Sequence, residues 1–154
     1  MRRVLSVVLV MAAAGVLAAR ATAQTSGLGI FESQSDVGNV TPVGKLTYDP
    51  GTRTYTIDSA GANLWMAEDD FHFVWKRISG DVSLTADVSF PLAPAGASPH
   101  RKALLMFRQT LDPDAVYADA ALHGDGETAL QYRGARGELV PQAREYERGC
   151  FRLQ

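Results

Sequence analysis

Apolar and polar residues alternate in several short segments of this chain, and turn-forming residues separate these segments. The clearest alternation covers residues 82–90, whose apolar positions are Val82, Leu84, Ala86, Val88 and Phe90. A period of two places the apolar side chains on one face of a β-strand. The pattern therefore predicts an all-β, antiparallel fold in which each sheet buries one face.

Other segments fit the same scheme. Residues 45–48 and 52–58 flank Asp49-Pro50-Gly51, a combination that favours a β-hairpin. The remaining expected strands are 71–78, 82–90, 101–110, 117–123 and 128–133, with Gly124-Asp125-Gly126 as the turn of the last hairpin. For the apolar run 103–107 a short buried helix is the alternative, because its period is not diagnostic. Strands at this spacing, without amphipathic helices, indicate a sandwich or a barrel.

The two ends of the sequence differ in composition from the middle. Residues 1–23 combine two arginines, an apolar run and Ala21-Thr22-Ala23, which predicts a Sec-type signal peptide cleaved after Ala23 and a periplasmic or secreted protein without a membrane span after processing. Residues 24–43 are expected to be an extended lead-in without strands, and 44–133 the β-sandwich domain. In residues 134–154 arginines and glutamates interleave, which favours one more strand and a charged tail.

The charge balance disfavours some classes of partner. Cleavage after Ala23 removes three arginines and no acidic residue, so 12 basic residues then face 17 acidic ones and the net charge is −5. Such a chain repels phosphate backbones and anionic lipids, so we expect no nucleic-acid partner. Cys150 is the only cysteine, which excludes an intramolecular disulfide.

Three stretches of the sequence carry a family resemblance. They are Gly61-Ala62-Asn63-Leu64-Trp65 leading into residues 71–76, then His100-Arg101-Lys102-Ala103, and finally residues 119–126. Together they resemble an exported bacterial branch of the concanavalin A-like lectin/glucanase superfamily that is associated with TolB-like propeller proteins. The resemblance implies a jelly-roll β-sandwich. Because such sandwiches have about a dozen strands and about eight are expected here, a truncated or frame-shifted sequence after about Arg133 would explain the difference.

The resemblance also implies a function. We expect a non-catalytic module that binds a glycan or a cell-envelope component through a concave sheet. One alternative is a structural module that docks a TolB-like propeller or an envelope protein, and another is a glycoside hydrolase or lyase.

Aromatic and polar side chains supply the candidate binding site, because sugar rings stack on aromatic faces and exchange hydrogen bonds with polar groups. The candidates are Asn63, Trp65, His72, Lys76, Arg101, Lys102, Arg108, Asp119, His123 and Asp125. Core packing is the alternative for Trp65, and we expect it for Trp75, which lies in an apolar strand. Arg108 lies in the apolar strand 101–110, so it must either find an acidic partner or face a groove.

Catalytic and metal motifs are weak by comparison. A glycosidase needs two carboxylates across a cleft, whereas 82–90 offers only Asp87 and the run Glu68-Asp69-Asp70 is expected to face water. We therefore expect no catalytic residues. The three histidines show no short two-histidine spacing, and the aspartates near turns lack the spacing of a calcium loop. We expect no metal site and no cofactor, with calcium as the alternative.

Overall fold

The computed structural model describes residues 27–91, 95–139 and 145–146, and every regular element in them is a β-strand. The strands are β1 (Ser33–Val37), β2 (Lys45–Asp49), β3 (Thr54–Asp58), β4 (Phe71–Trp75), β5 (Lys102–Arg108), β6 (Tyr117–His123), β7 (Thr128–Arg133) and β8 (Glu145–Tyr146). All strand pairs are antiparallel, which confirms the expected all-β, antiparallel class. Across these described ranges, no helix is long and apolar enough to span a membrane.

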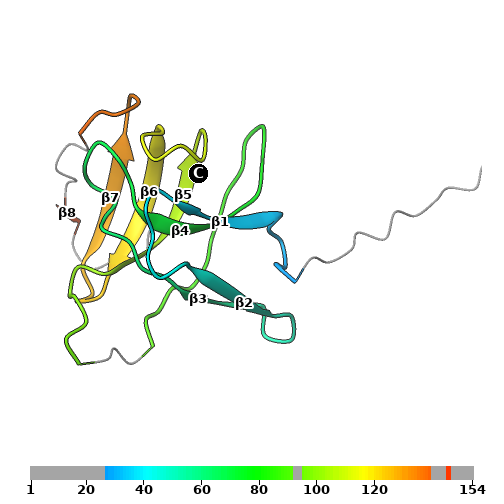
Figure 1. Ribbon diagram of the computed structural model, residues 1–154. Helices are drawn as coiled ribbons and strands as arrows, with labels where there is room; N and C mark the ends of the chain where they lie inside the picture. Colours follow the sequence, from blue (N-terminus) through cyan, green and yellow to red (C-terminus); the bar gives the residue numbers. More distant parts are fainter. Residues whose placement is uncertain (1–26, 92–94, 140–144, 147–154) are drawn as a thin grey trace, which may run out of the picture.

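The strands form three sheets, shown in Figure 1. β1 pairs with β4, β2 pairs with β3, and β5, β6, β7 and β8 form a four-stranded sheet in that order. The two-stranded sheets are made by the first half of the chain and the four-stranded sheet by the second half. Neighbouring strands in the larger sheet are also neighbours in sequence, as in a meander.

Local turn chemistry explains the hairpins that were predicted correctly. In the turn between β2 and β3 the carboxylate of Asp49 accepts hydrogen bonds from the Gly51 N–H at 2.8 Å and the Thr52 hydroxyl at 2.8 Å. An Asp side chain that accepts hydrogen bonds from the residues following it stabilises a turn in this way. β6 and β7 have the predicted bounds, and residues 102–108 form a strand, so the helix alternative for 103–107 is wrong.

The prediction of a strand at 82–90 is wrong. The structure has no named strand in this segment, and Figure 1 shows the chain after β4 as an open loop. Val88 is 36% exposed, and Val82 and Leu84 are only half-buried. Alternation determines which face a strand would bury, but a strand also needs a partner with free backbone groups. β4, the preceding strand, instead pairs with β1 and ends at Trp75 rather than at the expected residue 78.

Two further differences concern the ends of the domain. β1 lies inside residues 24–43, which were expected to contain no strand. After β7, β8 provides the one additional strand expected in the tail, at residues 145–146. The predicted signal peptide and Cys150 lie outside the described residues.

The four-stranded sheet has two different faces. Residues of β6 alternate between buried and half-buried positions, beginning with buried Tyr117, and the register carries the same two faces across β5 and β7. We call the face that contains Tyr117 the inner face. Its Met106 and Tyr117 pack with Val37 of β1 and Phe71 of β4 in the main hydrophobic cluster. The β1–β4 ribbon therefore covers part of the inner face.

Candidate functional site

The inner face also carries polar side chains in the row next to Tyr117 and in the last row of β6. Lys102 of β5 lies opposite His123 of β6, and Asp119 of β6 lies opposite Gln131 of β7. Both pairs are on the same face, and the row of Leu104, Ala121 and Ala129 lies between them, so the four polar side chains extend along about 13 Å of this face. Asp119 is fully buried, Gln131 is 1% exposed and His123 is 8% exposed.

Three of these buried side chains have unused hydrogen-bonding capacity. Neither carboxylate oxygen of Asp119, neither amide atom of Gln131 and neither ring nitrogen of His123 has a hydrogen-bond partner within the described chain. A buried polar group without a partner costs about 1–3 kcal/mol, so such groups are rare in folded proteins unless they have a function. Their concentration on one face marks this part of the sheet as a candidate site.

Burial also changes the protonation of the site. It raises the pKa of Asp119 from 3.8 to about 8, although the positive charge of Lys102 opposes the rise. Burial lowers the pKa of His123, and the charge of Lys102 lowers it further. Near neutral pH, Asp119 is therefore mainly an uncharged carboxylic acid and His123 a neutral imidazole. Each of these groups can then both donate and accept a hydrogen bond.

The loop between β3 and β4 covers the site and adds an aromatic side chain. The Lys102 ammonium donates a hydrogen bond to Asn63 Oδ1 at 2.9 Å and lies 5.4 Å from the centroid of the Trp65 ring. Trp65 is half-buried and Asn63 is exposed, so both lie at the rim. We call the whole group the Lys102 site; it consists of Asn63, Trp65, Lys102, Asp119, His123 and Gln131.

Five of the ten predicted residues are thus brought together, and Gln131 was missed. A sequence signal for Gln131 existed, because in strand 128–133 position 131 lies on the same face as Ala129 and Arg133. Arg101 and Asp125 lie next to the site rather than in it. Arg101 donates hydrogen bonds to Ser98 O and Gly124 O, and Asp125 accepts one from the Glu127 N–H at 3.1 Å.

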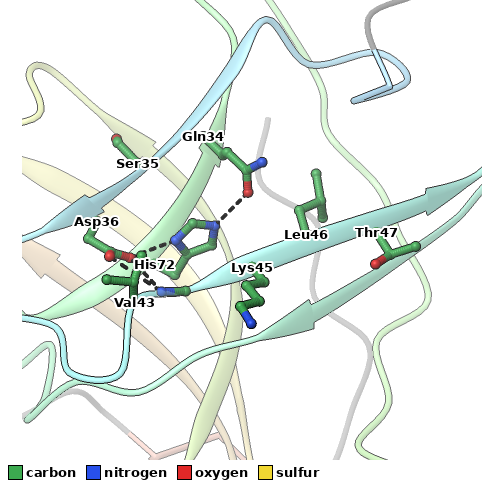
Figure 2. Close-up of a pocket in the computed structure, with 9 residues that line it drawn as sticks. Gln34, Ser35, Asp36, Val43, Lys45, Leu46, Thr47 and His72 are labelled. Atoms are coloured by element: carbon green, nitrogen blue, oxygen red, sulfur yellow. Dashed lines mark hydrogen bonds and ion pairs between the residues drawn. The ribbon is translucent and has the colours of Figure 1, made fainter.

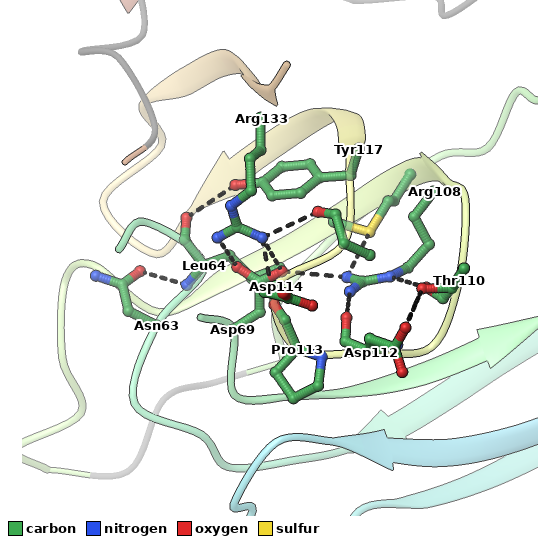
Figure 3. Close-up of polar contacts among 12 residues, drawn as sticks. Asn63, Leu64, Asp69, Arg108, Thr110, Asp112, Pro113, Asp114, Tyr117 and Arg133 are labelled. Carbon is green, nitrogen blue, oxygen red and sulfur yellow. Dashed lines mark hydrogen bonds and ion pairs between the residues drawn. The ribbon is translucent and has the colours of Figure 1, made fainter. Parts of the chain in front are cut away.

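Arg108 is not part of the Lys102 site. Its Nη1 lies 3.2 Å from Asp69 Oδ2, so of the two alternatives for a charge in this strand the structure shows the acidic partner. Asp69 also binds Arg133, as Figure 3 shows, and it is fully buried. The expectation that all of Glu68-Asp69-Asp70 faces water is therefore wrong for Asp69. Two arginines neutralise its charge, which makes burial tolerable.

His72 lies in a different place. It lines a cavity of about 400 Å³ between β1, β4 and β2, shown in Figure 2. Its Nδ1 lies 2.7 Å from Asp36 Oδ1 and its Nε2 lies 3.0 Å from Gln34 Oε1. Both ring nitrogens are thus engaged within the protein. Lys76 is exposed directly after β4 and is not a member of the Lys102 site either.

Trp75, which was expected in the core, is half-buried, and its indole N–H donates a hydrogen bond to the Ser35 hydroxyl at 3.2 Å. This bond joins β4 to β1.

No known protein family, curated protein or solved structure matches this chain.

Proposed function

We propose that this protein is a non-catalytic binding module that recognises a glycan, or a glycan-bearing cell-envelope component, at the Lys102 site. The observation that supports this function best is the set of buried polar groups without partners on Asp119, Gln131 and His123. A ligand that supplies hydrogen bonds to these groups would recover the free energy lost by burying them.

The chemistry of the site suits sugar hydroxyls. A hydroxyl both donates and accepts hydrogen bonds, and so do the Gln131 amide, the protonated Asp119 carboxyl and the neutral His123 ring. Trp65 adds an aromatic face on which the C–H face of a sugar can stack. The only full positive charge in the site is that of Lys102, and it is already shared between Asn63 and Trp65. These features favour a neutral, hydroxyl-bearing ligand over a strongly anionic one.

In this proposal the ligand reaches the buried groups by displacing part of the loop over the site. Lys102 is half-buried beneath this loop, and burial lowers its pKa. A sugar that stacks on Trp65 would replace the hydrogen bond between Lys102 and Asn63 with one of its own. In this proposal the rim makes the first contact and the groups beneath it provide selectivity.

The proposal also includes the finer features of the fold and location. The domain would be a concanavalin A-like jelly roll, exported to the periplasm or beyond by the predicted signal peptide. The antiparallel all-β class and the packing of the β1–β4 ribbon on the larger sheet support the fold, and the composition of residues 1–23 supports the location.

Docking of a propeller-type or envelope protein is the second candidate function, and one observation favours it. The outer face of the four-stranded sheet is apolar, with Leu105, Phe107 and Leu130 half-buried and Tyr132 51% exposed. Exposed apolar areas of this kind often bind another protein.

A glycan array tests the first candidate. We expect the folded protein to bind a defined subset of neutral glycans, and Trp65→Ala and Lys102→Ala to reduce binding by about tenfold or more, since each removes a contact worth at least about 1.4 kcal/mol. Lys76→Ala is the matched control, because it removes the same charge at an exposed position outside the site. Circular dichroism would confirm that all variants fold. Absence of binding across the array, or equal losses for Lys76→Ala and Lys102→Ala, would contradict the proposal and favour the docking function.

A further inference from the structure

A second cluster of side chains lies where β6 turns into β7. His123 is the last residue of β6, Asp125 lies in the turn and Glu127 directly precedes β7. One potential ligand atom from each of these residues lies within 4.8 Å of the other two, and His123 Nδ1 is 3.5 Å from Glu127 Oε2. The spacing His-x-Asp-x-Glu therefore brings one imidazole and two carboxylates together.

The histidine is the reason to regard this cluster as a site rather than as a group of surface acids. Its side chain is 9% exposed, and both of its ring nitrogens lack a hydrogen-bond partner in the part of the chain described. Metal-binding histidines need exactly one neutral, unblocked ring nitrogen directed at the ion. The lowered pKa of His123 is consistent with this role, because it keeps the ring neutral near pH 7.

The backbone holds the three residues in place without help from a ligand. The N–H of His123 donates to Glu127 O at 2.7 Å, and the N–H of Gly126 donates to His123 O at 3.0 Å. A neighbouring loop fixes the other side of the turn, since the N–H of Gly124 donates to Arg101 O at 2.8 Å and that of Asp125 donates to Pro99 O at 3.2 Å. Only the exposed side chain of Asp125 and the half-buried side chain of Glu127 need to rotate in order to bind an ion together with His123.

From this arrangement we infer that His123, Asp125 and Glu127 form a binding site for a first-row transition-metal dication such as Zn²⁺. Metal–ligand distances of about 2.0–2.2 Å place neighbouring ligand atoms of a tetrahedral site about 3.4 Å apart. The pair formed by His123 and Glu127 already has about this separation, at 3.5 Å, and the ligand atom of Asp125, which lies within 4.8 Å of the other two, has to approach by at most about 1.4 Å. The imidazole ligand favours zinc over calcium and magnesium, which prefer oxygen ligands only.

The charges around the cluster limit the affinity but do not exclude the ion. Asp125 and Glu127 contribute two negative charges, whereas Lys102 acts on His123 as a positive charge and Arg101 binds the carbonyl of Gly124. The exposed ring of His100 lies beside that of His123, with 6.2 Å between ring centroids. His123 is shared with the Lys102 site, but the metal site does not rest on the proposed glycan function.

Calorimetric titration of the metal-free full chain with ZnCl₂ tests the inference. We expect saturable binding of one Zn²⁺ per chain, and a loss of about tenfold or more in affinity for each of His123→Gln and Glu127→Gln. Asp125→Asn should weaken binding as well. Its matched control is Asp49→Asn, which changes an equivalent aspartate in the β2–β3 turn and should leave zinc binding unchanged.

Thermal unfolding gives a second readout that does not depend on the calorimetric titration. A site formed only by the folded chain should raise the unfolding temperature when zinc is added, and His123→Gln should abolish this rise. Trp65→Ala should retain zinc binding even where it loses glycan binding, which separates the two proposals. The absence of saturable zinc binding to the folded wild-type protein, or binding that His123→Gln and Glu127→Gln leave intact, would overturn the inference.

Discussion

Arg133 and Asp69 are 64 residues apart in the sequence and form a two-point ion pair in the interior of the protein. Arg133 Nη2 lies 2.7 Å from Asp69 Oδ1, and Arg133 Nη1 lies 2.8 Å from Asp69 Oδ2. The guanidinium also donates to the backbone carbonyls of Met66, Pro113, Ala115 and Glu138, with the two hydrogens of Nη1 shared among Asp69, Pro113 and Ala115. One side chain of β7 thus fixes the loop that covers the Lys102 site, the β5–β6 connection and the segment after β7.

This arrangement predicts that Arg133→Met destabilises the protein strongly. The substitution leaves Asp69 buried with only Arg108 as a charged partner, and breaking a buried ion pair on one side costs about 3–5 kcal/mol. Urea denaturation measures the free energy of unfolding. Arg136→Met is the matched control, because Arg136 makes its ion pairs with Asp112 and Asp114 at the surface and should be replaceable without a large loss. Equal losses of unfolding free energy in the two variants would show that the buried ion pair contributes no more to stability than the surface ion pairs.

The protonation of Asp119 predicts a decrease in stability between about pH 4 and pH 8. The unfolded chain releases this proton near the ordinary pKa of 3.8, whereas the folded chain keeps it until a pKa of about 8. Folding therefore takes up a proton in this range, and the unfolding free energy falls as pH rises, by an amount on the order of a few kcal/mol. Asp119→Asn should remove this slope. Urea denaturation at several pH values tests it, and an unchanged slope in the variant would contradict a raised pKa for Asp119.

Two glycines should differ in the stability lost when each is replaced by alanine: Gly61, in the loop that carries Trp65, and Gly80. Gly61 has φ +140° and a Cβ at this position would collide with the backbone carbonyl of Asp70, whereas Gly80 has φ +81° and open space around it. Gly80→Ala should cost only the strain of a positive φ, about 1 kcal/mol, and Gly61→Ala should cost clearly more. Thermal unfolding compares the two variants. A similar loss of stability in both would mean that the loop adapts to a side chain at position 61.

Local features of the sequence were sufficient for part of the fold. Turn chemistry at Asp49-Pro50-Gly51 and Gly124-Asp125-Gly126 predicted two hairpins, and the segments that bracket the second turn have the predicted bounds of β6 and β7. β1 was missed because its residues are mostly polar, and their partners come from β4: Asp36 and Gln34 bind His72, and Ser35 binds Trp75. Residues 82–90 failed for the opposite reason: their alternation is suitable, but in the described part of the chain only Leu84 forms a β-bridge and the segment is not a strand.

The candidate site shows the same division between local and long-range information. Residue type was enough to select Lys102, Asp119 and His123 as polar candidates in expected strands. The buried role of Asp69 was not predictable, because its partners Arg108 and Arg133 are 39 and 64 residues away. Only the tertiary structure determines which charges meet across such separations.

The affinity of Gln131→Leu for a glycan selected on the array, measured by isothermal titration calorimetry, tests the account most directly. The Gln131 amide is buried without a partner, so replacing it with an apolar side chain of similar size should keep or raise stability. The account predicts that this folded variant binds the glycan about tenfold more weakly or worse, because a ligand contact worth about 1.4 kcal/mol or more is lost. Unchanged affinity in the folded variant would contradict the claim that the buried polar groups of the Lys102 site bind the ligand.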